Sequence, residues 1–297
     1  MFMKLYNKKS KGSVYMLLDL PKMEEIQIKN GSAKIKFDEF NQRVKILSFK
    51  GDLEDLMNQL TVYESKCTIG KIFSIIPKED IDVYKSQGFI IEAKIDQFLN
   101  GQPAYFLSKF LTSKRKTSMH LPEEEEVLIR SREYISEDYI NPTYEQYTIR
   151  DVRKEDADEL AKLYDEVFET YPSPLNNSTY IQFAMDHNVF FKVAVYENKI
   201  VSAASADTDP INLNAEITDC ATSKSFTGHG LIGRLIFELE KDLKAKNYKV
   251  LYSTARSIST GMNIVFAKHD YVYGGRLVNH CHICGQLENM NIWCKVL

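Results

Sequence analysis

The segment with the strongest chemical signal runs from Ala215 to Leu235 and reads AEITDCATSKSFTGHGLIGRL. It predicts a strand, a turn that contains Gly228 and Gly230, and then a helix. Glycine lets the backbone bend sharply and approach a ligand, and the free N–H groups and dipole at a helix N-terminus attract phosphate. The segment therefore suits a pyrophosphate, although such a glycine pair taken alone is more often a tight turn. It lacks the third glycine and the acidic residue of a dinucleotide-binding fingerprint.

Two carboxylates, Glu216 and Asp219, lie on the strand before this loop. A positioned carboxylate can act as a general base. Alternate side chains of an extended strand point to opposite faces, so residues 216 and 218 should share one face and Asp219 should lie on the other. We therefore expect the two carboxylates to have different roles.

A second chemical pattern is His280-Cys281-His282-Ile283-Cys284, which contains two thiols and two imidazoles. These are zinc ligands in many proteins. The segment reads as a strand, however, whose alternation sends Cys281 away from its neighbours, and no second ligand pair follows. We expect a packed strand and no metal. Trp293 and the tyrosines of the closing strands are likewise expected in the core.

The elements around these residues alternate between strand and helix. The glycine loop is followed by an apolar helix face of Leu231, Ile232, Leu235, Ile236, Leu239 and Leu243. A helix is expected over residues 154–168, a hairpin over FFKVAVYENKIVSAASA, a strand at YKVLYSTA, a short helix over 259–268, and two closing strands. The fold class is a mixed α/β sheet protein, of the α+β type.

Charge and composition limit the partners of the chain. Its 297 residues carry 38 Lys and Arg against 41 Asp and Glu, so the net charge is -3 and no positive field attracts nucleic acid or anionic lipid. Hydrophobic residues make up 44% of the chain, which indicates a folded protein, and five cysteines do not suggest a disulfide framework. No run reaches the ~20 apolar residues of a membrane helix. We expect a soluble cytoplasmic protein.

The composition changes between residues 113 and 146, where basic residues, four consecutive Glu and two Pro occur. This segment is predicted to be a charged linker between an N-terminal α/β domain, residues 1–112, and a C-terminal domain, residues 147–297. The order of elements in KIFSIIPKEDIDVYKSQGFIIEAKI repeats that of KVLYSTARSISTGMNIVFAKHDYVYGGRL, which favours an internal duplication. The N-terminal copy has only Lys50-Gly51-Asp52 in place of the glycine loop.

The glycine loop resembles the acetyl-CoA loop of the GNAT acetyltransferase superfamily, Arg/Gln-x-x-Gly-x-Gly/Ala. Thr227 stands at the Arg/Gln position, Gly230 at the central glycine and Ile232 at the last small residue, so two of three positions depart. In the superfamily the pyrophosphate is held mostly by backbone N–H groups. The resemblance implies a GNAT fold in the C-terminal half, preceded by a smaller degenerate GNAT-like domain, and acetyl-CoA as co-substrate. The two departures are expected to weaken the binding of that co-substrate.

Longer motifs resemble the β-lysine N-acetyltransferases: YPSPL, AEITDCAT, YSTARSISTGMNIVFAKHDYVYGG and GQLENMNIWCKVL, and in the first half FNQRVKIL, GKIFSIIP and GFIIEAKIDQFLNGQPAYFLSKFL. This resemblance implies transfer of acetyl to the ε-amino group of β-lysine, which gives the compatible solute Nε-acetyl-β-lysine. Lysine 2,3-aminomutase would supply the substrate. Another small amine, or an acyl-CoA-binding module without activity, stays open, as does a homodimer.

The resemblance also assigns residues to the site. Glu216 matches the general base of histone-type GNAT enzymes, and Asp219 is the second candidate. Phe266 stands where many of these enzymes use a Tyr to protonate the leaving thiolate, so Tyr271 or water is expected to serve. Tyr171 and Pro172 stand where the acceptor pocket is shaped. Apart from the resemblance, Arg256 directly after the strand YKVLYSTA is a candidate to bind a substrate carboxylate, and a surface salt bridge is its alternative. The expected cofactor-binding residues are Cys220, Ala221, Thr222, Phe226, Thr227, Gly228, His229, Gly230, Leu231, Ser259 and Phe266.

Overall fold

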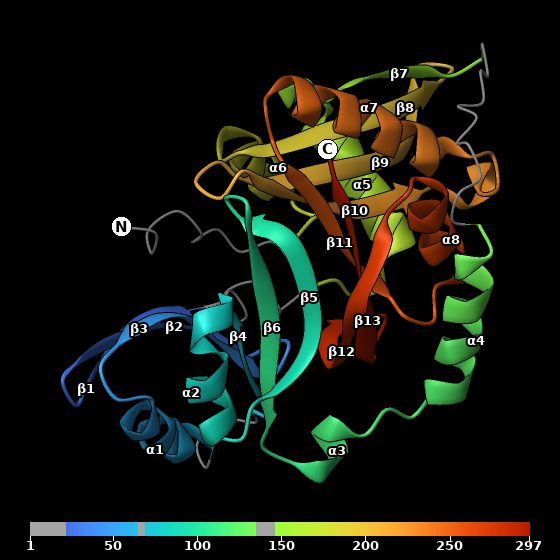
Figure 1. Cartoon of the computed structure of the whole chain (residues 1–297). Helices are drawn as coiled ribbons and strands as arrows, with labels where there is room; N and C mark the ends of the chain where they lie inside the picture. Colours follow the sequence, from blue (N-terminus) through green and yellow to red (C-terminus); the bar gives the residue numbers. More distant parts are fainter. Residues whose placement is uncertain (1–21, 65–68, 135–145) are drawn as a thin grey trace.

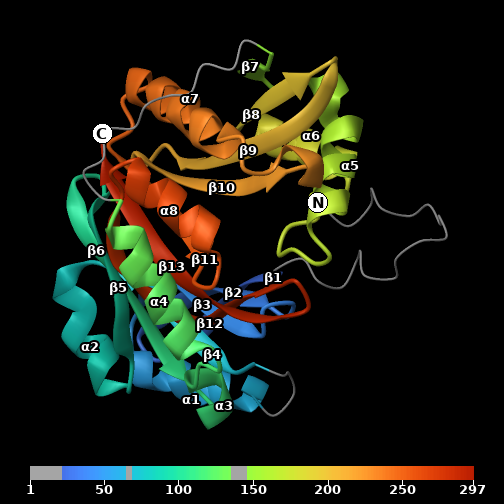
Figure 2. The ribbon, with the colours of Figure 1, turned by 90° about the vertical axis from the view of Figure 1, so that its right-hand side faces the viewer.

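The computed structural model of the chain describes residues 22–64, 69–134 and 146–297 (Figures 1 and 2). The strands of these residues form one mixed sheet in the order β1-β2-β3-β4-β6-β5-β12-β13-β11-β10-β9-β8-β7. Helices cover parts of both faces. None of the helices described is long and apolar enough to span a lipid bilayer.

The C-terminal half contains seven strands, which run from β12 to β7 in the order of the sheet. Its antiparallel strands β7 to β10 are followed by β11, which runs parallel to β10, and by the hairpin β12-β13, whose second strand pairs with β11. The elements are β7 (Thr148–Asp151), α5 (Ala157–Val167), α6 (Ser178–Asp186), β8 (Val189–Tyr196), β9 (Lys199–Asp209), β10 (Asn214–Thr222), α7 (Leu231–Ala245), β11 (Val250–Arg256), α8 (Thr260–Lys268), β12 (Val272–Ile283) and β13 (Gln286–Val296).

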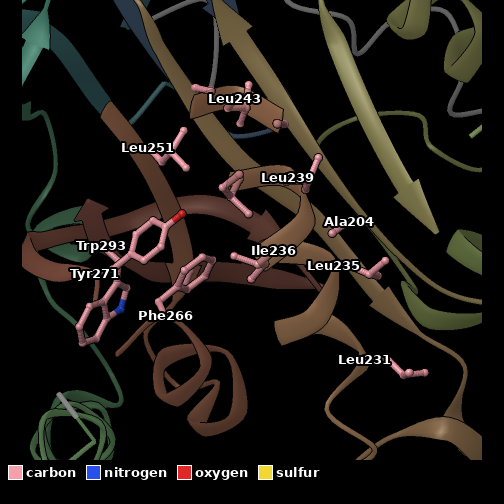
Figure 3. Close-up of a cluster of buried hydrophobic side chains, with 14 of the residues drawn as sticks. Ala204, Leu231, Leu235, Ile236, Leu239, Leu243, Leu251, Phe266, Tyr271 and Trp293 are labelled. Carbon is pink, nitrogen blue, oxygen red and sulfur yellow. The ribbon is translucent and has the colours of Figure 1, made fainter. Parts of the chain in front are cut away.

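Helix α7 packs its apolar face on the sheet, as the sequence pattern predicts. Leu235, Ile236 and Leu239 are fully buried and meet Phe266 and Trp293 in one cluster (Figure 3). Helices α5 and α6 pack on the opposite face of the same strands. Strand β9 is thus buried on both faces, which its run of Ala and Ser side chains permits because small residues let helices approach from both sides.

The N-terminal half repeats this order of connections. Three antiparallel strands lead into a helix, a strand parallel to the third, a second helix, and a hairpin whose last strand pairs with the strand between the helices. An internal duplication would produce this repeat. The elements are β1 (Lys22–Ile28), β2 (Gly31–Asp38), β3 (Arg43–Lys50), α1 (Leu53–Glu64), β4 (Lys71–Ile76), η1 (Lys78–Asp80), α2 (Ile81–Ser86), β5 (Ile90–Leu99) and β6 (Gln102–Phe110).

The two halves join through the equivalent strands β5 and β12. Gly275 pairs with Ala93, has φ 142°, and a side chain there would meet the Glu92 carbonyl oxygen at 2.2 Å. Beside this contact the buried Lys71 ammonium lies 2.7 Å from the Glu92 carboxylate and donates to the Val278 carbonyl at 2.9 Å. The close backbone approach, and the hydrogen bonds that this ion pair of the N-terminal half makes with the Val278 backbone, therefore hold the halves together.

The segment predicted as a solvated linker contains helices α3 (Ser113–Lys116) and α4 (Leu121–Arg132). Glu124 of the acidic run is 2% exposed and accepts a hydrogen bond from the Asn289 amide at 2.6 Å, while Leu128 joins the C-terminal core. Helix α4 lies against α8 (Figure 2). The prediction of a solvated connector is wrong for this helix because partners distant in sequence bury one of its faces. The remainder of that segment, residues 135–145, lies outside the described residues.

Candidate active site

A cavity of about 560 Å³ lies between the two halves. Its walls come from β2, β3 and β4 on the N-terminal side and from β9, β10, β11 and β12 on the C-terminal side. The charged and polar lining residues include Lys36, Asp38, Arg43, Lys45, Tyr171, Ser173, Asp207, Glu216, Thr218, Asp219, Cys220, Tyr252, Thr254, Arg256, Ser259, His280 and Cys281.

The cavity reaches the place where β10 and β11 separate. Their paired residues end at Glu216 and Tyr252; beyond that point β10 pairs with β9 and β11 with β13. Two parallel strands that diverge leave a cleft between them. Glu216 therefore stands at the base of the opening between these strands, on the strand that leads into the glycine loop and α7.

Strand β10 carries a bulge that changes the direction of its side chains. One extra residue lies between Thr218 and Ala221, and Asp219 there has φ 51°. A bulge breaks the two-residue alternation of a strand. Glu216 and Asp219 consequently line the same cavity, so the prediction that they lie on opposite faces is wrong.

The Glu216 carboxylate is fixed by two hydroxyl groups from β11. Thr254 donates to its Oε1 atom, and Tyr252 donates to its Oε2 atom at 3.3 Å. Burial raises the pKa of Glu216, and the neighbouring Asp207 and Asp219 charges raise it further, whereas the Thr254 hydrogen bond lowers it. The result is an oriented carboxylate that holds a proton more strongly than one in water.

Asp219 is buried at the bulge and accepts a hydrogen bond from the Ser205 hydroxyl at 2.6 Å. Burial raises its pKa to about 6, against the lowering effect of the Ser205 hydrogen bond. Tyr171 also lines the cavity, and its hydroxyl oxygen lies 3.4 Å from the Thr218 hydroxyl oxygen. Two carboxylates with raised pKa values thus face one cavity, which is a common arrangement at catalytic sites.

The glycine loop enters α7 through a left-handed turn. Gly228 has φ 82° and Gly230 has φ 70°, and Gly230 precedes the helix without a side-chain cap. The side chains of the loop are held away from this end: the His229 Nδ1 atom lies 2.7 Å from the Tyr147 hydroxyl, and the Thr227 hydroxyl donates to the Lys224 carbonyl of the short helix η3 (Lys224–Phe226). The first N–H groups of α7 therefore remain available to an anion, as a pyrophosphate would require.

The other residues expected at the cofactor divide into two groups. Cys220, Ser259 and Phe266 line the cavity. Ala221 and Leu231 are buried in hydrophobic clusters, the Thr222 hydroxyl lies 2.8 Å from the Ser202 hydroxyl, and Phe226 packs against aromatic rings. In this second group Ala221 and Leu231 are buried, whereas Thr222 and Phe226 are partly exposed.

Tyr271 lies away from the cavity. It is fully buried in the core beside Phe266, and its hydroxyl has no hydrogen-bond partner among the described residues (Figure 3). Burial and the Glu240 charge hold its pKa far above the ordinary value. The expectation that Tyr271 protonates a leaving group is therefore contradicted, because no proton of this side chain reaches the cavity.

The expected substrate residues Tyr171, Pro172 and Arg256 all line the cavity. The Arg256 guanidinium, however, donates to the Glu288 carboxylate at 2.8 Å, and Glu288 is 3% exposed. The charge of Arg256 is therefore already balanced by Glu288 within the protein.

The histidine and cysteine pattern forms part of the wall between the halves. The His280 ring meets the Phe73 ring edge-on at 4.8 Å between centroids, and Cys281 accepts a hydrogen bond from Arg43 at 3.5 Å. Both residues line the cavity because the register of β12 shifts between Leu277 and Cys281. Burial holds the pKa of His280 well below its ordinary value. Within the described ranges no three His, Cys, Asp or Glu side chains are grouped to hold a metal ion.

Several lining residues come from the N-terminal half, to which sequence reasoning assigned no role. A sequence pattern that could have indicated such a role is present in RVKIL, where Arg43 and Lys45 alternate with the buried Val44 and Ile46. Such alternation indicates that the charged side chains share the face opposite the core. Nothing local in this pattern shows that the face closes a cavity.

Residues 157–269 match the Acetyltransferase (GNAT) family. The Beta-lysine N(6)-acetyltransferase of Methanococcus maripaludis is 34% identical over 92% of this chain and 99% of its own length, and the protein with the same name from Methanosarcina mazei is 33% identical over 84% of this chain and 100% of its own length. N-acetyltransferase YodP of Bacillus subtilis is 32% identical over 93% of this chain and 100% of its own length.

A solved N-acetyltransferase from Staphylococcus aureus Mu50 covers 50% of this chain and 98% of its own, with 17% identity and a TM-score of 0.45. The curated relatives, by contrast, extend over both halves of the sheet and over the cavity between them. The chain therefore belongs to the GNAT acetyltransferase family, in the group that includes the β-lysine N(6)-acetyltransferases, and is an acetyl-CoA-dependent enzyme that transfers acetyl to an amine.

Proposed function

We propose that this enzyme acetylates the ε-amino group of β-lysine, 3,6-diaminohexanoate, and that the product, Nε-acetyl-β-lysine, serves as a compatible solute. The observation that carries the proposal is the cavity between the halves, with most of its carboxylates on the C-terminal wall and most of its cations on the N-terminal wall. A small amino acid with a second ammonium group complements both walls. The names of two curated relatives support the same acceptor.

Acetyl-CoA supplies the acetyl group as a reactive thioester. The residues fit this co-substrate, because the uncapped start of α7 offers N–H groups at Leu231, Ile232 and Gly233 to its diphosphate. The cleft between β10 and β11 leads from there to Glu216. The side chains of Cys220 and Ser259 line the cavity at the reacting end.

The amine must lose a proton before it can react. A lysine-type ammonium has a pKa of about 10.4, so near pH 7 only about one molecule in 2,500 is neutral, a penalty of roughly 4.6 kcal/mol. A positioned base contributes about 100- to 10,000-fold, which is the same order. The chain therefore needs a base at the end of the cleft.

We assign this role to Glu216, acting directly or through one water molecule, with Asp219 as the second candidate. Glu216 stands where the strands separate, and its two oxygen atoms are held by Thr254 and Tyr252. Its raised pKa makes it a stronger base than an ordinary carboxylate. One proton of the ammonium passes to Glu216, and the amine nitrogen bonds to the acetyl carbon. As the carbon–sulfur bond breaks, the nitrogen loses its second proton, which passes through water to the departing thiolate.

The departing thiolate requires little assistance. Phe266, at the position where many relatives of the superfamily place a Tyr, lines the cavity and has no proton to donate. Tyr271 is enclosed in the core. A thiol with a pKa of about 8.5 leaves readily as its anion, and water can protonate it afterwards.

The test is a competition assay with purified enzyme, acetyl-CoA and an equimolar mixture of β-lysine, lysine, ornithine and polyamines, read by mass spectrometry. We expect Nε-acetyl-β-lysine as the main product. A higher kcat/KM for another amine would overturn β-lysine as the acceptor. A gene for a lysine 2,3-aminomutase beside this one would support the proposed supply of substrate.

A further inference from the structure

The N-terminal sheet presents two different faces. Helices α1 and α2 cover one face, where Val44 and Ile46 of β3 are buried. The other face carries Arg43 and Lys45 of β3 and Lys36 of β2, and all three line the cavity. The N-terminal half therefore contributes three cations to a site where Glu216 and Asp219 come from the C-terminal half.

These cations differ in their partners. Arg43 donates to the Asp38 carboxylate at 2.9 Å and to the His280 carbonyl at 2.9 Å, so its charge is used in the joint between the halves. Lys45 has no ion pair and no hydrogen bond among the residues the structure describes. Its ammonium lies 5.8 Å from the centre of the Phe73 ring. Within the described part of the chain, Lys45 is therefore a cation in the cavity without a counter-ion in contact.

The surroundings of Lys45 disfavour its charged form when no ligand is bound. Burial, with the neighbouring Lys36 and Arg43 charges, lowers the pKa of Lys45 to about 8. The carboxylates of Glu216 and Asp209 act in the opposite direction, but they lie beyond the 4 Å of an ion pair. A bound anion beside Lys45 would compensate the burial of its charge.

Arg256 is the other cation that sequence reasoning suggested for this role. Its guanidinium already pairs with the buried Glu288, so a substrate carboxylate there would compete with an internal partner. Lys45 has no such competitor. The difference favours the N-terminal wall as the place where an acceptor's anionic group binds.

We propose that the N-terminal half forms part of the acceptor site and that Lys45 binds the carboxylate of the acceptor amino acid while its reacting amine lies at Glu216. This inference rests on the proposed function and deepens it. An amine without a carboxylate would leave Lys45 unpaired, so the residue selects amino acids against simple diamines. Selectivity of this kind arises when a site holds a polar group that only the correct substrate satisfies.

The test compares β-lysine with 1,4-diaminopentane, which is β-lysine without its carboxylate, for the wild type and for Lys45→Met. Loss of a charged hydrogen-bond partner should lower kcat/KM for β-lysine roughly 10- to 100-fold. The kcat/KM for the diamine should stay within about threefold, because no contact to it is removed. Lys45→Arg should retain most of the preference. Lys34→Met, on the exposed face of β2, is the matched control and should change neither value.

Two other results would overturn the proposal. An equal loss with both amines would make Lys45 an electrostatic partner of Glu216 and overturn the proposal. The proposal would also be overturned if Lys45→Met kept the preference for β-lysine over the diamine while Arg256→Met or Lys36→Met lost it. Thermal melting checks the fold, and we expect Lys45→Met to melt no lower than the wild type because a half-buried charge without an ion-pair partner among the described residues is removed.

Lysine and cadaverine form a second pair with and without carboxylate. If the wild type prefers lysine to β-lysine, the proposed acceptor fails, but the effect of Lys45 can still be measured with this pair. A wild type that acetylates diamines as well as amino acids would overturn the carboxylate site for either acceptor.

Discussion

Replacement of Glu216 by Gln tests the proposed base. Gln keeps the shape of the side chain and an oxygen that can accept the Thr254 hydrogen bond, but it cannot take a proton. We expect kcat/KM to fall about 100- to 10,000-fold at pH 7, the contribution of a positioned base. This magnitude offsets most of the roughly 4.6 kcal/mol needed to deprotonate the amine.

The pH dependence of this variant distinguishes a base from a structural residue. In the wild type, kcat/KM should fall as the pH drops through the Glu216 pKa, which burial raises, because only the ionised carboxylate accepts a proton. The Gln variant should lack that acidic limb. Its deficit should also shrink near pH 10, where much of the amine is neutral without help.

The assay is steady-state release of free thiol from acetyl-CoA with β-lysine as acceptor, together with thermal melting. Acetyl-CoA at ~100 times its dissociation constant should stabilise both proteins by about 2.7 kcal/mol. Asp209→Asn is the control, since it removes a charge near the cavity from a residue that is not on its wall. An unchanged rate constant for Glu216→Gln, or an equal loss in Asp209→Asn, would refute Glu216 as the base.

Three further predictions concern stability, measured by urea unfolding. Gly275→Ala should lower the free energy of unfolding by about 2–4 kcal/mol, because the new side chain would meet Glu92 and Ala93. Gly285→Ala, with φ 83° and open space around it, should lower it by about 1 kcal/mol. Equal losses would contradict the close approach at Gly275. Glu92→Gln should lower the free energy of unfolding by about 3–5 kcal/mol, because it leaves the Lys71 charge buried and unpaired. Adding Lys71→Met should restore part of that loss. No recovery in the double variant would argue against the ion pair. Asp219→Asn should stabilise the fold by up to about 3 kcal/mol at pH 7.5, because the folded protein holds this carboxylate ionised although its pKa is about 6. The gain should shrink toward pH 5, where the folded wild type binds the proton, and a gain that grows on acidification would contradict the shift.

Local signals in the sequence predicted most elements of the C-terminal half. The apolar repeat of α7 and the turn at Glu197 and Asn198, both with positive φ, depend on residues close in sequence. The glycine loop and the position of Glu216 were predicted for the same reason. Each of these features is determined by residues that are close together in the sequence.

The features that were missed depend on contacts distant in sequence. The alternation rule failed at Asp219 because nothing in AEITDCAT specifies the bulge that turns this side chain into the cavity. Helix α4 was taken for a solvated linker because its burial comes from Asn289 and α8. The cavity itself requires β5 and β12 to meet, a pairing between residues about 180 positions apart, and so the role of Lys45 could not be predicted.

A crystal structure of the enzyme with coenzyme A and β-lysine is the most direct test of the central claim. We predict the diphosphate against the N–H groups at residues 228–233 and the ε-amino group beside Glu216. The acceptor should lie in the cavity between the halves, with its carboxylate toward Lys45. A diphosphate bound elsewhere, or an acceptor outside this cavity, would contradict the account.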